Sequence, residues 1–153
     1  MKPKLLVSAC LLGTPCRYDG KSKKNEAVCA LAERFELIPV CPEVLGGLPT
    51  PRTPSERRGA CVVRKDGRDV TAEYRRGAEC ALETARREGV LAAVLKERSP
   101  SCGSGEIYDG TFTGALTAGD GVTAELLKVN GMTVYGEGEQ SLTEFLCSVS
   151  HST

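Results

Sequence analysis

Short apolar runs alternate with amphipathic segments along the whole chain. The apolar runs cover Lys4–Leu12, Leu37–Pro42, Val90–Leu95 and Met132–Tyr135. Near-continuous runs of this length are typical of strands that are buried on both faces, as in a parallel sheet. The two prolines of the second run predict a strand at the sheet edge, or one whose pairing ends early, because proline donates no ladder hydrogen bond.

The segments between these runs show the periodicity of helices. Helices are predicted over Ser22–Arg34 and Thr71–Arg87, from Ala118 or Asp120 to Val129, and over Ser141–Ser148. Strands that alternate with helices in this way predict an α/β fold, with a mostly parallel Rossmann-like or flavodoxin-like sheet and flanking helices. We expect one domain over residues 1–153, with a core from about residue 4 to residue 147, since this length suits a single domain.

Glycine and proline punctuate two longer segments, 43–59 and 103–114, which are predicted to be functional loops. Between them, an Asp-Gly pair predicts the turn of a β-hairpin that joins Cys61–Arg64 to Arg68–Val70. In open α/β sheets, ligands collect at the carboxyl ends of the strands, near the point where strand order reverses. Three polar stretches are expected to meet there, namely Cys10–Asp19, Cys41–Arg52 and Lys96–Gly105.

Charge and composition disfavour several classes of protein. Lys+Arg and Asp+Glu number 20 each, so no basic field favours binding to a large nucleic acid. No apolar stretch approaches the ~18 residues of a membrane helix, and the N-terminus lacks a signal-peptide core, so we expect a cytoplasmic protein without a membrane partner. The only histidine is His151, close to the C-terminus, which disfavours Ser-His-Asp, Cys-His and histidine-rich metal sites.

Eight cysteines in a chain of 153 residues need an explanation. A reducing compartment disfavours four structural disulfides. The lack of a Cys-x-x-Cys motif weakens a zinc-ribbon or thioredoxin-like interpretation. Cys29, Cys80 and Cys147 lie on helical patterns and are interpreted as core residues, whereas the roles of Cys41 and Cys61 stay open.

The other three cysteines, Cys10, Cys16 and Cys102, follow predicted strands, and their thiolates are expected at one edge of the sheet. Three thiolates there would hold an iron–sulfur cluster and leave one iron without a protein ligand. Burial of Cys10 and Cys102 as ordinary strand-end cysteines explains the spacing equally well. A zinc-binding or thiol-redox protein would use the same cysteines. A non-enzymatic nucleotide-binding module is a third hypothesis, although neither phosphate-binding glycine motif is present.

Three blocks of the sequence together resemble the thiouracil desulfidase family. They are Ser8–Gly13 with Cys16–Gly20, Cys41–Glu43 with Gly46–Leu48 and Pro51–Arg52, and Lys96–Gly103. The resemblance extends from about Lys4 to Gly136 and matches the short single-domain form of the family. It implies a [4Fe-4S] cluster on Cys10, Cys16 and Cys102, whose fourth iron binds the sulfur of a small thiolated pyrimidine base or nucleoside. The implied reaction removes sulfur from substrates such as 4-thiouracil to give uracil and sulfide, without net redox change.

The resemblance also implies roles for side chains near the cysteines. It matches the family's catalytic glutamate to Glu43 and its catalytic serine to Ser101. On local sequence alone, a solvated loop acid and an ordinary turn serine are the alternatives. Four further residues are predicted to bind or orient the substrate, or to offset the negative charge of the cluster: Ser8, Arg52, Lys96 and Ser99. The sequence makes no prediction of oligomeric state.

Overall fold

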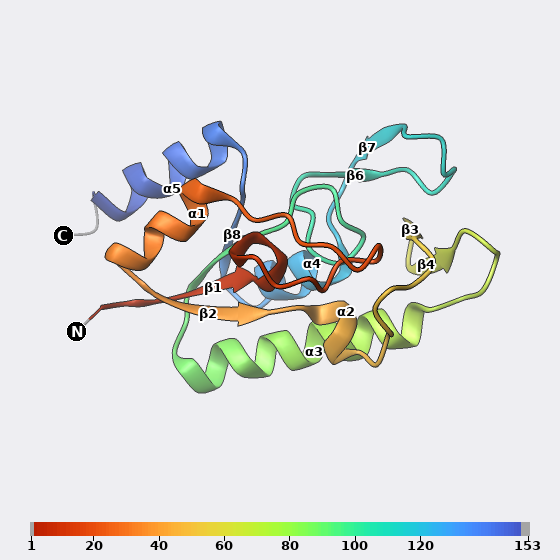
Figure 1. Cartoon of the computed structure of the whole chain (residues 1–153), viewed down its shortest axis with the longest axis horizontal. Helices are drawn as coiled ribbons and strands as arrows, with labels where there is room; N and C mark the ends of the chain where they lie inside the picture. Colours follow the sequence, from red (N-terminus) through yellow and green to blue (C-terminus); the bar gives the residue numbers. More distant parts are fainter. Residues whose placement is uncertain (1, 151–153) are drawn as a thin grey trace.

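Four parallel strands form the central sheet, in the order β2-β1-β5-β8 (Figure 1). They are β1 (Lys4–Ser8), β2 (Glu36–Val40), β5 (Ala92–Leu95) and β8 (Thr133–Gly136). The structure is a computed structural model, and it describes residues 2–150. Strand order reverses between β1 and β5, because the chain adds β2 on one side of β1 and the later strands on the other. The predicted α/β fold with a parallel sheet is confirmed, and the proline-containing β2 lies at an edge.

Helices cover both faces of this sheet. On one face lie α3 (Thr71–Glu88) and α4 (Val122–Val129), which also pack against each other. The other face is covered by α1 (Glu26–Cys29) and α5 (Glu139–Ser150). In Figure 1, α3 runs below the sheet, whereas α1 and α5 lie above it.

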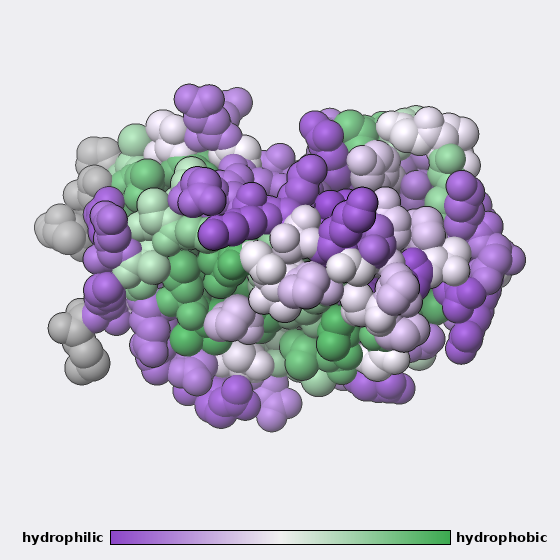
Figure 2. Space-filling model, in the orientation of Figure 1, coloured by the Kyte–Doolittle hydropathy of each residue, from purple (hydrophilic) through white to green (hydrophobic). Residues whose placement is uncertain are grey.

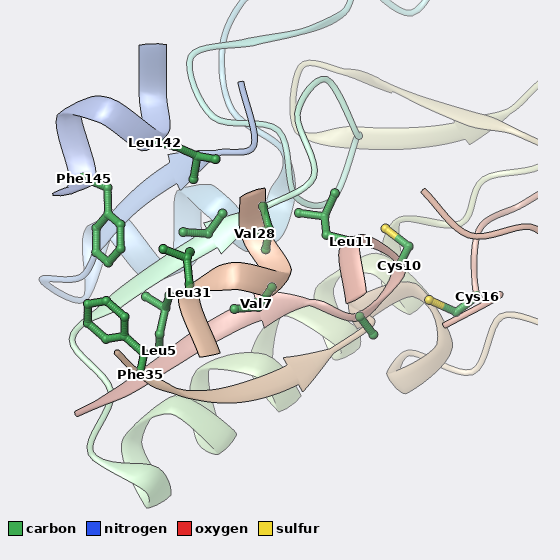
Figure 3. Packing of buried hydrophobic residues seen from close by; sticks show 12 residues of the cluster. Leu5, Val7, Cys10, Leu11, Cys16, Val28, Leu31, Phe35, Leu142 and Phe145 are labelled. Atoms are coloured by element: carbon green, nitrogen blue, oxygen red, sulfur yellow. The ribbon is translucent and has the colours of Figure 1, made fainter. Parts of the chain in front are cut away.

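The inner strand β1 is buried on both sides, as its apolar run predicts. Successive side chains of a strand point to opposite faces. Leu6 therefore joins the apolar layer of α3 and α4, whereas Leu5 and Val7 join the layer of α1 and α5. In the second layer, the rings of Phe35 and Phe145 lie 5.3 Å apart between centroids and close the far end of the core (Figure 3).

The first strand is shorter than the apolar run that predicts it. The run continues to Leu12, but β1 ends at Ser8, and a 3₁₀ turn, η1 (Ala9–Leu12), follows it. Leu11 is fully buried in this turn. An apolar run alone does not distinguish a buried strand from a buried helical turn, which explains the difference. Cys10 therefore lies on a tight turn at the carboxyl end of β1.

The first helix also begins later than predicted. The pattern starts at Ser22, whereas α1 begins after Asn25, whose side chain accepts a hydrogen bond from the Val28 amide at 3.0 Å. The chain then tightens into a second 3₁₀ turn, η2 (Ala30–Glu33). An Asn cap of this kind satisfies one of the free amides at the helix start. The residues before the cap are left to form the loop that carries Cys16.

Two antiparallel hairpins stand at the edge toward which the arrows of β1 and β2 point (Figure 1). In one, β3 (Ser55–Arg58) pairs with β4 (Cys61–Arg64); in the other, β6 (Glu106–Tyr108) pairs with β7 (Leu116–Ala118). The predicted turn at Asp66-Gly67 is confirmed, because Cys61–Arg64 and Arg68–Val70 meet antiparallel around it through an isolated bridge and two flanking backbone hydrogen bonds. The sequence did not predict that β4 pairs along its whole length with β3 on its other side. The polar sequence of β3, Ser-Glu-Arg-Arg, lacks the pattern of a strand, so its segment is predicted as loop.

A short helix, α2 (Pro42–Leu45), lies between β2 and the first hairpin and packs on α3. Its outer side carries Val44 and Leu45, which are each 43% exposed. Figure 2 shows an apolar patch over this helix, and the surface around the patch is mostly polar. Among residues 2–150, no helix is long and apolar enough to span a membrane.

Candidate functional site

A cavity of about 570 Å³ opens at the carboxyl ends of β1, β2 and β5, beside the point where strand order reverses. Its walls come from the segments that follow these strands, and the two hairpins contribute further wall residues. The predicted site residues that line it are Ser8, Cys10, Cys16, Glu43, Arg52, Lys96, Ser99 and Cys102. Ser101 is the member of the predicted set that does not line it. The three loops therefore meet where ligands collect in sheets of this topology.

Three buried thiols reach this cavity from two loops. Cys10 and Cys16 are 8% exposed and come from the end of β1, whereas Cys102 is 5% exposed and comes from the loop after β5. A hydrogen bond between the Cys10 and Cys16 side chains raises the pKa of Cys16, and burial raises the pKa of Cys102 to about 12. Figure 3 shows Cys10 and Cys16 together at one end of the core. Without a metal, Cys16 and Cys102 are therefore protonated thiols at neutral pH.

A fourth cysteine, Cys41, lines the same cavity at the end of β2. Its thiol donates to the Cys16 carbonyl oxygen at 3.7 Å. The pKa of Cys41 is raised mainly by a hydrogen bond to the Cys16 side chain and, to a smaller extent, by burial. The two cysteines lie 25 positions apart in the chain, so no local pattern predicts their contact.

The donor set fits an iron–sulfur cluster better than a single metal ion. Among residues 2–150, no three His, Cys, Asp or Glu side chains lie close enough to hold one ion. A tetrahedral zinc site needs its ligands around one centre, whereas a four-iron cluster binds each cysteine to a different iron. The donors are all sulfur, which suits such a cluster, and ligation would remove the protons that burial now keeps on the thiols.

Glu43 reaches the cavity because α2 packs very close to α3. Pro42 occupies the first turn of α2, where its missing N–H costs nothing, and Glu43 follows it. Gly46 of α2 and Gly77 of α3 lie at the contact between the helices, and a Cβ atom on either would overlap backbone atoms of the other helix. This pair of glycines therefore sets the distance between the helices and, with it, the position of Glu43.

Arg52 holds the Glu43 carboxylate. Its Nε atom donates to Glu43 Oε2 at 2.8 Å, and one Nη atom donates to the same oxygen. The remaining N–H groups face the Cys16 carbonyl at 2.9 Å, the Pro49 carbonyl at 3.1 Å and the Thr50 hydroxyl at 3.0 Å. A guanidinium has five N–H donors, and all five face acceptors of the protein. Arg52 therefore holds Glu43 and the Cys16 loop in place, and its predicted role in substrate binding stays a prediction.

Tyr74 is a residue of this site that sequence reasoning missed. It lies on the inner side of α3 and is 2% exposed, and its hydroxyl is within hydrogen-bonding reach of Glu43 and Ser55. The pKa of Tyr74 is raised mainly by burial and, to a smaller extent, by the negative charge of Glu43. The phenol therefore stays neutral and can donate a hydrogen bond. An apolar position on an amphipathic helix predicts only a core residue, which is why the pattern did not reveal this contact.

The loop after β5 turns Ser101 away from the cavity. Its hydroxyl lies 2.8 Å from the Thr123 hydroxyl of α4 and also reaches the Cys102 thiol, and the residue is 1% exposed. Ser99 lines the cavity, and its hydroxyl oxygen accepts the amides of Ser101 and Cys102, each at 3.0 Å. The two serines therefore shape the turn that presents Cys102.

The other two predicted substrate-binding residues have partners within the protein. Lys96 forms an ion pair with Glu137 at 3.0 Å, although the residue lines the cavity. The Ser8 hydroxyl accepts the Lys96 amide at 2.8 Å and also reaches the Cys102 thiol. Ser8 thus joins β1 to the cysteine loop of β5.

The remaining cysteines lie outside the cavity. Cys29 and Cys80 are half-buried, so they contribute only in part to the core that their helical patterns predict. The interpretation of Cys147 as a core residue is wrong, because it is exposed on α5. Cys61, whose role the sequence left open, is exposed on β4.

These features define a class of protein: an α/β fold with a buried thiol-rich cavity and an arginine-held carboxylate at the switch point of a parallel sheet. The family model of 2-thiouracil desulfurase matches residues 5–139. The chain therefore belongs to the 2-thiouracil desulfurase family, and the resemblance carried by the three sequence blocks is confirmed.

Individual relatives agree over nearly the whole chain. The uncharacterized protein YbbK of Bacillus subtilis (strain 168) is 44% identical over an alignment of 145 residues, which covers 88% of this chain and 96% of that protein. The solved structure of a [4Fe-4S]-dependent thiouracil desulfidase, TudS, is 50% identical and superposes with a TM-score of 0.90. That match covers 97% of this chain and 99% of the solved one.

Proposed function

We propose that this protein is a [4Fe-4S]-dependent desulfidase that hydrolyses the C–S bond of thiolated pyrimidines such as 4-thiouracil. The observation that carries the proposal is the cavity in which three buried thiols and the Glu43–Arg52 pair lie together. The 50% identity to a [4Fe-4S]-dependent thiouracil desulfidase supports it. The substrate is a small base or nucleoside, and the products are the corresponding uracil and sulfide.

Cys10, Cys16 and Cys102 would hold the cluster. When bound, it supplies an iron without a protein ligand, which acts as a Lewis acid toward the substrate sulfur. Cys41 is left out of the ligand set, because a fourth cysteine would occupy that iron. Ser101, which reaches the Cys102 thiol from outside the cavity, acts on the orientation of that cysteine.

Glu43 is the proposed general base. The two hydrogen bonds that Arg52 donates to Glu43 both go to Oε2. The other carboxylate oxygen of Glu43, Oε1, accepts no bond from Arg52 and can take a proton from water. As the water oxygen bonds to the ring carbon, one electron pair of the C=S bond moves to sulfur. The second pair leaves with sulfur when the remaining C–S bond breaks and the C=O bond forms. Glu43 returns the first water proton to sulfur, and the second water proton follows it there. The sum is thiouracil plus water giving uracil plus hydrogen sulfide, with no change in oxidation state.

Anaerobic reconstitution tests the proposed function. We expect brown protein with iron and acid-labile sulfide, and release of free sulfide and uracil from 4-thiouracil. A parallel incubation without reconstitution should release none. Colourless protein that binds zinc stoichiometrically and releases no sulfide would contradict the proposal and support the zinc hypothesis.

Replacement of Arg52 by lysine should lower kcat and leave KM nearly unchanged. Lysine cannot reproduce the planar fork that holds Glu43, and a misplacement of a catalytic group by about 1 Å costs on the order of 100-fold in rate. Steady-state kinetics of sulfide release measures the effect. Arg64→Lys is the matched control, since Arg64 pairs with Asp66 and does not line the cavity. A rise in KM at constant kcat would show instead that Arg52 binds substrate.

A further inference from the structure

Aromatic side chains gather around the cavity. The chain has four tyrosines, three phenylalanines and no tryptophan. Phe35, Tyr135 and Phe145 pack together in the core. The other four, Tyr18, Tyr74, Tyr108 and Phe112, all line the cavity. Aromatic rings in the lining of a cavity suit a planar ligand.

The loop that carries Phe112 is attached to β3 by three hydrogen bonds. Glu56 is 9% exposed, and its Oε1 atom accepts the amides of Gly110 at 2.9 Å and Phe112 at 3.1 Å. Arg58, also on β3, donates from Nε to the Gly110 carbonyl at 2.7 Å. The loop joins β6 to β7 in the hairpin at the upper right of Figure 1. A buried carboxylate therefore defines the path of an otherwise exposed loop.

Phe112 itself has a backbone that phenylalanine rarely adopts. Its φ is 58°, in the left-handed region, which costs a bulky residue free energy. Such strain persists only where the surrounding structure compensates for it, and here the bonds to Glu56 do so. The Arg58 guanidinium lies over the Phe112 ring, 5.9 Å from its centroid. The ring is thus supported by β3 while it lines the cavity.

We propose that Phe112 is a substrate-positioning residue, whose ring stacks on the pyrimidine and is held in place by Glu56. This inference rests on the proposed function, which supplies the planar substrate. A phenyl ring has no polar group, so its contribution to such a ligand comes from ring contact. Tyr74 is 2% exposed and lies beside Glu43, and Tyr18 is 42% exposed although Arg17 lies over its ring at 5.6 Å. Phe112 is half-buried and is held by two side chains of β3, which favours it over both.

The test is calorimetric titration of uracil into anaerobic holoenzyme, together with steady-state kinetics in which 4-thiouracil is the substrate. Loss of one base–aromatic stack weakens binding on the order of 5- to 150-fold. Phe112→Ala should raise both the Kd for uracil and the KM for the thiolated substrate by factors in this range, and Phe112→Tyr should restore both. Leu116→Ala, in the same hairpin but outside the cavity, should change neither. A wild-type Kd for Phe112→Ala would overturn the proposal.

Glu56→Ala tests the attachment. It should weaken uracil binding as Phe112→Ala does, and the double variant should be little worse than either, because both changes remove one contact. Additive losses would overturn the role given to Glu56. Failure of the proposed function is distinct, since it appears as absence of sulfide release by the wild type. If the wild type released no sulfide but bound uracil in a way that depends on Phe112, the proposed function would be wrong and the role of Phe112 in binding would still hold.

Discussion

The Cys102→Ala variant should lose both the iron–sulfur cluster and sulfide release. Cys102 is the one proposed ligand from the β5 side of the cavity, so its loss leaves only Cys10 and Cys16 of the proposed set. Two thiolates give no stable anchor for a centre that needs at least three. Iron and acid-labile sulfide analysis after anaerobic reconstitution, with sulfide release from 4-thiouracil, measures both effects, and each should fall to the level of the blank.

Cys80→Ala is the matched control for this change. Cys80 is a half-buried cysteine on α3 that does not line the cavity, and its variant should reconstitute as the wild type does. Because Cys102 is buried, its truncation also costs about 1 kcal/mol of folding free energy, and thermal denaturation of both apoproteins checks that the fold survives. A Cys102→Ala protein with full iron content would show that the ligand set is wrong.

The Glu43→Gln variant should keep its cluster and lose turnover. The amide has nearly the shape of the carboxylate and still accepts from Arg52, but it cannot take a proton from water. General-base catalysis is worth about 100- to 10,000-fold, and kcat should fall by a factor in this range. Glutamine is preferred to alanine here, because alanine would leave the Arg52 charge buried without its partner.

A second arginine-paired glutamate provides the comparison for Glu43. Glu125 on α4 pairs with Arg57 at 2.6 Å and lies outside the cavity. The Glu125→Gln variant should retain the iron content and the kcat of the wild type. If Glu43→Gln were as active as Glu125→Gln, the base would have to be another group. The visible absorption of the cluster should be the same in all three proteins.

Apolar periodicity predicts the parts of this fold that are buried by apolar contacts. The four sheet strands and the three longer helices all stand near their predicted ranges, because their apolar residues alternate or recur with the period of the element. The same logic fails for β3, where Glu56 and its neighbours are polar, although its partner β4 follows it directly in the chain. It also fails at Leu11, since a buried turn and a buried strand have the same apolar composition.

The candidate site, like the fold, could be predicted only in part from the sequence. Topology brings Cys10, Cys16 and Cys102 to one cavity, as the position of their segments after strands predicts. What the side chains bind there depends on tertiary contacts that leave no trace in local sequence. Arg52 meets Glu43 only because α2 and the following loop fold over each other, and Ser101 turns toward α4 because Thr123 accepts or donates a bond there.

The contact between Gly46 and Gly77 has a consequence for directed evolution of the substrate range. Neither position tolerates a side chain without moving α2, and α2 carries Glu43. Larger or differently shaped substrates therefore have to be accommodated at another part of the cavity wall, such as the one to which the β6–β7 hairpin contributes Tyr108 and Phe112. Variant libraries that spare the two glycines and diversify Tyr108 and Phe112 would explore new specificity while the reacting groups keep their places.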